Sequence, residues 1–191
     1  MTVLTRWTSA DLDRLPLNEL TRYEIIDGEL FASSPNHVCH QRVCGEIVML
    51  LNTWNEARGI GHAVFAPGLI FSQYDDVAPD VVWLSRKRLA DGLDENGHLR
   101  VAPELIAEVL MPGVDDERRD REAKLLLYSR CGVSEYWIVN WIARTIDLYR
   151  RDQPQLHYVA TLFESDKIES PLLPGFSCSV AVLFERIPRG E

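Results

Sequence analysis

Residues 103–113, PELIAEVLMPG, place a single acid inside an apolar run. Read as a strand, the segment 105–110 is apolar at every position except Glu108, and the period of two puts that carboxylate on one face with Ile106 and Leu110. An ionised carboxylate that leaves water loses several kcal/mol unless it is paired, hydrogen-bonded or bound to a metal. Glu108 is therefore a candidate site residue, and the fold can be read outward from its strand.

A second apolar stretch, APDVVWL at residues 78–84, has the same form. Asp80 shares a face with the valine and the leucine two and four positions later, and Pro79 suits the first residue of a strand. Two lone acids in two apolar strands indicate a common site. The alternative is structural: one acid caps a turn, and the other pairs with an arginine such as Arg118 or Arg121.

The segment 114–132, VDDERRDREAKLLLYSRCG, predicts a helix, because acids lead its first turns and a glycine follows its end. The face that carries Leu127 and Tyr128 continues toward the N-terminus through Lys124 and Asp120. This spacing predicts a lysine at the edge of the core. The alternative is an exposed i, i+4 pair of Asp120 and Lys124, which would contribute only roughly a few tenths of a kcal/mol.

Together, two carboxylates and one lysine suit phosphodiester hydrolysis. The oxygens of Asp80 and Glu108 are hard ligands that could hold Mg²⁺ or Mn²⁺, while the Lys124 ammonium stabilises charge or orients a water. In such chemistry the metal neutralises the phosphate and activates water, and a cationic side chain offsets the developing negative charge. We therefore predict Asp80 and Glu108 as metal ligands, and all three residues as catalytic.

The remaining segments predict an α/β (α+β) fold with a central mixed sheet flanked by helices and an N-terminal β-hairpin. Asp27-Gly28 predicts the hairpin turn between strands at 23–26 and 29–32. Helical spacing predicts a helix over 37–58, which Gly59 ends. Further strands are predicted within 62–72, 134–140, 145–151, 157–163 and SVAVLF at 179–184, and a short helix within 85–100.

Composition limits the class of protein. The 191 residues are expected to form one domain, and the formal net charge of -9 excludes coating of nucleic acid by the overall field, although a local basic face is compatible with it. The four cysteines show no CxxC pair, so we expect reduced thiols rather than disulfides or a zinc site. With no signal-like N-terminus and no long apolar run, we expect a cytoplasmic protein without membrane association.

The order of motifs resembles the Uma family of putative restriction endonucleases, within the PD-(D/E)xK nuclease superfamily. The resemblance covers about residues 23–184 and rests on the following motifs: RYEIIDGEL (22–30), SP (34–35), the histidine at 40, APDVVWLSRKRL (78–89), PELIAEVL (103–110), DREAKLLLYSRCGVSEYWIV (120–139) and SPLLPGFSCSVAVLF (170–184). It implies a restriction endonuclease-like core, with Asp80 and Glu108 as its two acids.

The resemblance also implies roles for residues outside the two strands. The superfamily places a lysine two positions after the second acid, where this chain has Leu110, and Lys124 on the following helix fits that role. Glu24 resembles the family's N-terminal acid and is an auxiliary candidate together with Asp120. The alternative for Glu24 is a hairpin residue that faces solvent or pairs with an arginine.

His40 matches a family histidine, which makes it a further auxiliary candidate as a water-positioning or phosphate-contacting residue. A zinc site with its neighbours His37 and Cys39 is not expected, because no second pair of ligands follows. The basic residues of the predicted second helix are candidates for phosphate contacts; they are Arg118, Arg119 and Arg121.

Several departures leave a second reading open. Met111, Gly113, Val114 and Asn140 stand where family members often carry polar or charged residues. The leading hypothesis is a metal-dependent endonuclease acting on DNA. The alternatives are a catalytically inactive nuclease-fold protein acting in nucleic-acid binding or protein assembly, and a hydrolase of another phosphorylated substrate. A homodimer is expected, because EYWIVN with the following tryptophan and the tail SVAVLF offer more apolar surface than one domain hides.

Overall fold

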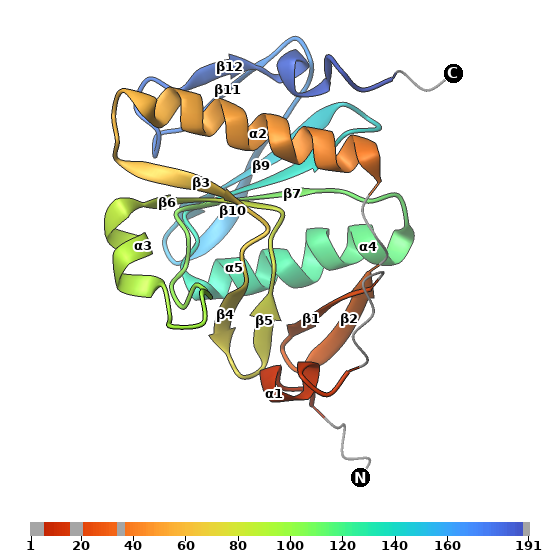
Figure 1. Ribbon diagram of the computed structural model, residues 1–191. Helices are drawn as coiled ribbons and strands as arrows, with labels where there is room; N and C mark the ends of the chain where they lie inside the picture. Colours follow the sequence, from red (N-terminus) through yellow and green to blue (C-terminus); the bar gives the residue numbers. More distant parts are fainter. Residues whose placement is uncertain (1–5, 16–20, 34–36, 189–191) are drawn as a thin grey trace.

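The computed structural model describes residues 6–15, 21–33 and 37–188 (Figure 1). Its centre is a six-stranded sheet in the order β10-β9-β8-β7-β6-β3. The strands are β3 (Gly61–Phe65), β6 (Val81–Ser85), β7 (Leu105–Val109), β8 (Glu135–Asn140), β9 (Thr145–Asp152) and β10 (Gln155–Leu162). Only the β7–β8 pair within this sheet is parallel. The predicted central mixed sheet is therefore confirmed.

The sheet separates two apolar cores, and Figure 1 shows a long helix on each side of it. The odd-numbered residues of β7, from Leu105 to Val109, pack with α2 (Val38–Glu56). Ile106 packs on the opposite face with α5 (Leu125–Cys131). Because strand residues alternate between faces, Glu108 lies on the α5 side of the sheet.

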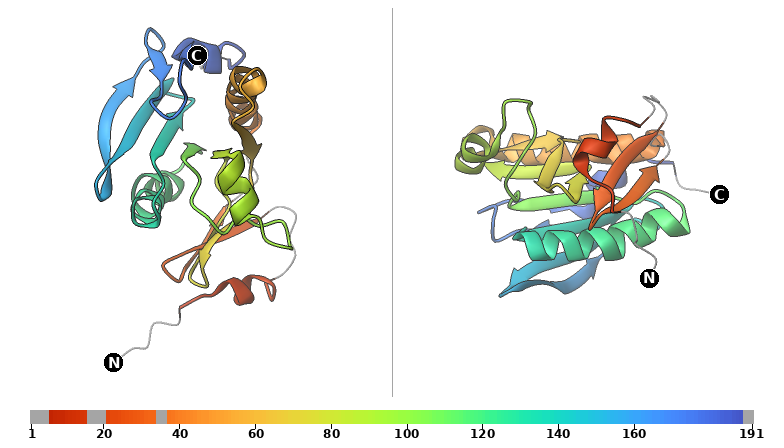
Figure 2. Two further views of the ribbon diagram at one scale, coloured as in Figure 1. Left: turned by 90° about the vertical axis from the view of Figure 1, so that its left-hand side faces the viewer. Right: turned by 90° about the horizontal axis from the view of Figure 1, so that it is seen from below.

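A second sheet of four strands, in the order β2-β1-β5-β4, lies beside the helix that ends in α5 (Figure 2, right). It consists of β1 (Arg22–Ile26), β2 (Glu29–Ser33), β4 (Leu69–Ser72) and β5 (Asp75–Val77), and the short helix α1 (Ser9–Leu12) precedes it. The predicted hairpin is confirmed, with Asp27 and Gly28 at φ of 52° and 79°. The predicted strand at 62–72 is divided between the two sheets, and Ala66 turns the chain with a φ of 45°.

The predicted helix at 114–132 is continuous but not uniformly α-helical. It runs through α4 (Val114–Arg118), the π-helical segment η1 (Arg119–Lys124) and α5, and ends at Gly132 with a φ of 92°. A π-helix is wider than an α-helix and leaves backbone groups out of the i to i−4 pattern. The Tyr136 hydroxyl donates a hydrogen bond of 2.9 Å to the carbonyl oxygen of Asp120, within this segment. The short helix expected within 85–100 is α3 (Arg86–Gly92).

The C-terminal region corrects two expectations. After β11 (Lys167–Glu169) and β12 (Ser177–Ser179), residues Val180–Phe184 form the 3₁₀ helix η2, so the strand predicted over SVAVLF is wrong. The buried residues of this helix are Val180, Leu183 and Phe184, a spacing of about three. Because all five residues of the helix are apolar, the sequence does not reveal this spacing.

Residues 135–139 of β8 are also buried within the chain. The premise of the expected homodimer, that these two segments expose apolar surface, is therefore wrong. Within the described residues all four cysteines are free thiols. No helix among the described residues has both the length and the apolar character needed to cross a bilayer.

Candidate metal-binding active site

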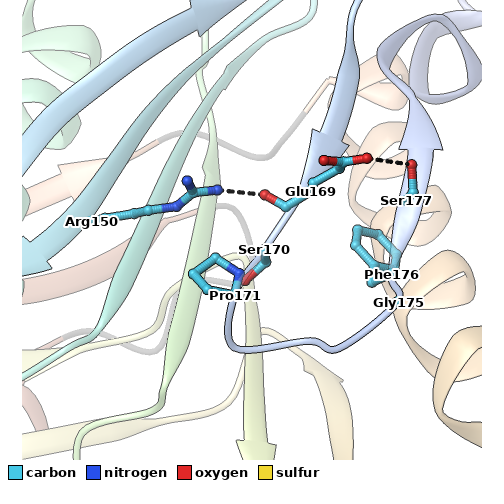
Figure 3. Close-up of a pocket in the computed structure, with 7 residues that line it drawn as sticks. All are labelled: Arg150, Glu169, Ser170, Pro171, Gly175, Phe176 and Ser177. Atoms are coloured by element: carbon cyan, nitrogen blue, oxygen red, sulfur yellow. Dashed lines mark hydrogen bonds between the residues drawn. The ribbon is translucent and has the colours of Figure 1, made fainter.

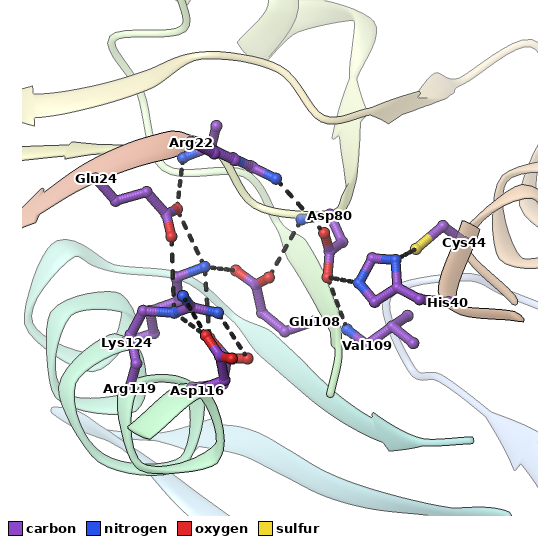
Figure 4. A network of polar contacts seen from close by, with 12 residues as sticks. Arg22, Glu24, His40, Cys44, Asp80, Glu108, Val109, Asp116, Arg119 and Lys124 are labelled. Carbon is purple, nitrogen blue, oxygen red and sulfur yellow. Dashed lines mark hydrogen bonds and ion pairs between the residues drawn. The ribbon is translucent and has the colours of Figure 1, made fainter. Parts of the chain in front are cut away.

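Four elements bring charged side chains to one buried cluster beside the end of β7 (Figure 4). Glu24 comes from β1, Asp80 directly precedes β6, Glu108 lies in β7, and Lys124 ends η1. The Lys124 Nζ lies 3.0 Å from Glu108 Oε1 and 3.1 Å from Glu24 Oε1. The residues that the sequence assigned to metal binding and catalysis therefore lie together.

Each of the two acids accepts a hydrogen bond from a backbone N–H at or next to the other acid. The Asp80 N–H donates to Glu108 Oε2 at 3.3 Å, and the Val109 N–H, next to Glu108, donates to Asp80 Oδ2 at 2.9 Å. This reciprocal arrangement follows from the antiparallel pairing of β6 with β7, in which Val81 lies opposite Ala107. The pairing places the backbone of Asp80 beside the Glu108 carboxylate, while the Asp80 carboxylate itself reaches His40 of α2.

The helix supplies the donors that hold one oxygen of Glu108. Glu108 Oε1 accepts hydrogen bonds from Lys124 Nζ at 3.0 Å and from the Tyr128 hydroxyl at 2.7 Å. Glu108 Oε2 accepts only the longer bond from Asp80, within the part of the chain that is described. Glu108 therefore keeps one oxygen with free acceptor capacity.

An outer layer of charges surrounds Lys124. Asp120 Oδ1 lies 3.5 Å from Lys124 Nζ and 3.0 Å from Arg119 Nε, and Arg119 Nε lies 3.7 Å from Glu24 Oε2. All four side chains are buried. The alternative of an exposed Asp120–Lys124 pair is therefore wrong. Of the alternative for Glu24, the exposure to solvent is wrong, whereas the pairing with an arginine is present as the contact with Arg119. Because the Lys124 ammonium is buried, its i, i+4 partner Asp120 is buried with it and belongs to the cluster.

Among the described residues, the cluster holds four buried carboxylates and three cations, and the partly exposed Asp116 lies 3.0 Å from Arg119 Nη1. The carboxylates are those of Glu24, Asp80, Glu108 and Asp120, and the cations are Arg22, Arg119 and Lys124. Burial raises the pKa of Glu108 to about 8; Lys124 opposes this rise, and the other three carboxylates reinforce it. The raised pKa of Glu108 is thus the result of burial first and of the neighbouring negative charges second.

Asp80 is shifted in the opposite direction. Burial opposes its ionisation, but the hydrogen bond from His40, the charge of Lys124 and the Val109 amide together lower the pKa of Asp80 to about 2. Adjacent carboxyl groups whose environments separate their pKa values are characteristic of catalytic sites. Near neutral pH, Asp80 is an anion while Glu108 largely retains its proton.

The donor set fits a hard divalent cation. Two neighbouring carboxylates offer oxygen ligands, and a cation would compensate the excess negative charge and displace the proton of Glu108. A softer set is also present, since ligand atoms of His40, Cys44 and Asp80 lie within 4.8 Å of one another. Burial raises the pKa of the Cys44 thiol well above its ordinary value, and the thiol form is a poor metal ligand. The oxygen pair is therefore the better metal site.

His40 instead contacts Asp80 from α2 and orients its carboxylate. His40 Nε2 lies 3.0 Å from Asp80 Oδ2, and His40 Nδ1 lies 3.6 Å from Cys44 Sγ, so the imidazole bridges α2 to the acid. The ring is buried, which does not suit the expected contact with a phosphate. His37, in contrast, caps α2 by accepting a bond from the Cys39 N–H.

The three arginines proposed for phosphate contacts have different surroundings. Arg119 pairs internally, and only 9% of its side chain is exposed. Arg121 pairs with Glu117 and Asp147. Arg118 pairs with Glu122 at 3.2 Å and has 74% of its side chain exposed, so it alone among the three is mainly exposed to solvent.

Arg22 is the site residue that the sequence reasoning missed. Its Nη1 lies 3.7 Å from Asp80 Oδ1, and Figure 4 shows it alongside Glu24 and Asp80. A signal was available, because Arg22 and Glu24 are two residues apart on one strand and must share a face. The SP dipeptide of the resemblance, at 34–35, lies outside the described residues.

Several cavities lie near the surface of the described chain. One of about 460 Å³ separates β2 from the helix and includes Arg119 in its wall, so it adjoins the cluster. Another of about 430 Å³ lies between β9 and the β11–β12 connection (Figure 3). Its walls are Arg150, Glu169, Ser170, Pro171, Gly175, Phe176 and Ser177. None of the predicted site residues contributes to the second cavity.

Comparison with known proteins supports the fold and assigns a family. The chain is similar to a crystal structure described as a "putative nuclease belonging to DUF820" from Anabaena variabilis, with 21% identity, a TM-score of 0.76, and coverage of 93% of this chain and 97% of that one. The type IIG restriction endonuclease BpuSI aligns with 76% of this chain and 15% of its own at 16% identity, and its TM-score of 0.32 is too low to carry an argument.

Among curated proteins, none matches the sequence. The predicted fold class is confirmed by the first similarity. A family model named Uma2 and described as "Putative restriction endonuclease" matches residues 9–181. This match covers most of the chain, and the chain therefore belongs to the Uma2 family of restriction endonuclease-like proteins.

Proposed function

We propose that the protein is an endonuclease that depends on Mg²⁺ or Mn²⁺ and hydrolyses phosphodiester bonds in DNA. The observation that carries the proposal is the buried cluster in which the Asp80 N–H donates to Glu108 Oε2, the Val109 N–H donates to Asp80 Oδ2, and Lys124 Nζ lies 3.0 Å from Glu108 Oε1. Membership of the Uma2 family supports DNA as the substrate.

In this proposal, Asp80 and Glu108 hold the cation. Such an ion neutralises a phosphate and lowers the pKa of a water molecule. Glu108 gives up its proton when the cation binds, while Lys124 keeps Glu108 Oε1 in place and balances the remaining carboxylates. Glu24 forms an ion pair with Lys124 and so helps to position the ammonium. His40 fixes the orientation of Asp80.

The test is cleavage of supercoiled DNA with Mg²⁺ or Mn²⁺, which a chelator should abolish. Glu108→Gln should reduce the rate by at least about a hundredfold, the scale associated with loss of one electrostatic contact to the transition state. The matched control is Glu122→Gln, which removes a carboxylate that is 66% exposed and outside the cluster. Metal binding without cleavage of DNA or RNA by the wild type would favour the inactive nuclease-fold protein.

Self-association forms part of the proposal, because cutting both strands of a duplex requires two active sites. A homodimer would have about twice the chain mass of 21.8 kDa. Light scattering at micromolar concentration measures this mass directly. A mass near that of one chain, with or without DNA, would refute the homodimer and leave the endonuclease proposal in place.

A further inference from the structure

Arg22 differs from the other cations of the cluster in its access to solvent. Its side chain is 30% exposed, whereas those of Lys124 and Arg119 are 2% and 9% exposed. Lys124 is also occupied by three carboxylates. Among the described cations of the cluster, Arg22 is therefore the one whose side chain is most accessible to a large anionic substrate.

The guanidinium of Arg22 is incompletely satisfied. Its Nη1 lies 3.7 Å from Asp80 Oδ1, which is an ion pair but too long for a hydrogen bond. Its Nη2 is buried and has no hydrogen-bond partner within the described part of the chain. A buried donor without a partner is costly, and native structures usually provide an acceptor. The unpartnered Nη2, next to the exposed part of the side chain, therefore points to an acceptor supplied by a bound ligand, which a small rotation of the guanidinium would bring within reach.

The position of Arg22 identifies the kind of acceptor. Asp80 Oδ2 is already bonded to His40 and to the Val109 amide, whereas Oδ1 faces only Arg22 among the described residues. Anything held at Asp80 Oδ1 thus lies within reach of the guanidinium. Arginine matches phosphate because its planar fork can bond two oxygens of one group.

We propose that Arg22 is a further catalytic residue, which binds a non-bridging oxygen of the phosphate to be cleaved. The inference rests on the proposed nuclease function and specifies which side chain binds the phosphate of the substrate. Arg22 would contact the phosphate from the side of Asp80, while Lys124 remains inside the cluster. The competing explanation is that Arg22 serves only as the counter-ion that orients Asp80.

Arg22→Gln, Arg22→Lys and the control Arg14→Gln separate these explanations. Arg14 is a suitable control because its side chain is 79% exposed and pairs only with Asp11 in the described chain. Three quantities are measured: Mn²⁺ affinity without DNA by calorimetry, Mn²⁺-dependent binding of a fluorescent oligonucleotide by anisotropy, and the rate of DNA nicking.

For a phosphate contact, Arg22→Gln should weaken oligonucleotide binding by about tenfold or more and slow nicking by on the order of a hundredfold. Mn²⁺ affinity should stay the same or rise, because a positive charge near the metal site has been removed. Arg22→Lys should recover only part of the binding, since an ammonium lacks the fork. The control should match the wild type in all three measurements.

The opposite pattern would overturn the inference. If Arg22→Gln weakens Mn²⁺ affinity in parallel with nicking, and Arg22→Lys restores both, Arg22 is the counter-ion of Asp80. Unchanged oligonucleotide binding in Arg22→Gln would also reject the contact, even if nuclease activity is present. If the wild type binds the oligonucleotide through Arg22 but does not nick DNA, the nuclease proposal fails while the phosphate contact stands. No binding by the wild type would reject both.

Discussion

The proton on Glu108 should make the stability of the metal-free protein fall as pH rises. The pKa of this group is raised from 4.5 to about 8 in the folded protein. Between these values the folded chain holds one proton more than the unfolded chain, so folding is progressively disfavoured as pH increases through the window. Below about pH 4.5 the penalty is absent, and above about pH 8 it is complete.

The magnitude follows from the size of the shift. A change of one pKa unit corresponds to about 1.4 kcal/mol, so a rise from 4.5 to about 8 gives an upper bound of about 5 kcal/mol. Relaxation and water entry reduce such penalties in buried sites, and on the order of 2–3 kcal/mol between pH 5 and pH 9 is the working value.

Glu108→Gln provides the measurement, because glutamine keeps the size of the side chain and cannot ionise. Urea unfolding with a chelator present should show the variant gaining stability relative to the wild type as pH rises from 5 to 9. Glu122→Gln controls for the loss of an exposed carboxylate. Saturating Mn²⁺ should reduce the pH dependence of the wild type, since a bound cation replaces the proton.

A stability difference between wild type and Glu108→Gln that stays constant from pH 5 to pH 9 would refute the reasoning. That result would mean that the 3.0 Å contact with Lys124 outweighs burial and the neighbouring acids. Glu108 would then be an anion throughout this pH range. The proton that compensates the excess negative charge would have to reside on another carboxyl group of the cluster.

Two other predictions concern the same cluster. Binding of Mn²⁺ near pH 7 should release roughly one proton from Glu108, which calorimetry in buffers of different ionisation enthalpy can count; zero release would contradict a protonated Glu108. Lys124→Met should destabilise the metal-free protein by about 3–5 kcal/mol, because Glu24, Glu108 and Asp120 lose their shared cation. Urea unfolding measures the loss, added Mn²⁺ should restore part of it, and a change below about 1 kcal/mol would show that the lysine is not the main counter-ion.

The sequence predicted the centre of the site because local periodicity determines it. A period of two put Glu108 on one face of β7, and the helical period put Asp120 and Lys124 on one face. These patterns became a three-dimensional cluster once β6 and β7 paired. The catalytic roles of the residues stay predictions, as does the single domain over the whole chain.

Other features depend on contacts distant in sequence and could not be predicted locally. The stretch 62–72 reads as one interrupted strand, but β3 pairs with β6 whereas β4 pairs with β5 in another sheet. His40 reads as a surface residue near a helix start, and only the packing of α2 on the sheet brings it to Asp80. Arg119 reads as part of a basic surface, and the widened helix directs it inward.

The π-helical segment Arg119–Lys124 carries one residue more than an α-helical turn would. Deleting one residue from its exposed side, such as Glu122, would therefore allow an ordinary α-helix whose two ends keep their orientation. Arg119 and Asp120 would then lie four and three positions before Lys124 in place of five and four, so they would stay on its face of the helix. Chains that share this fold could thus differ by one residue in the length of this helix and still keep a complete charge cluster, with every acid of the two strands unchanged.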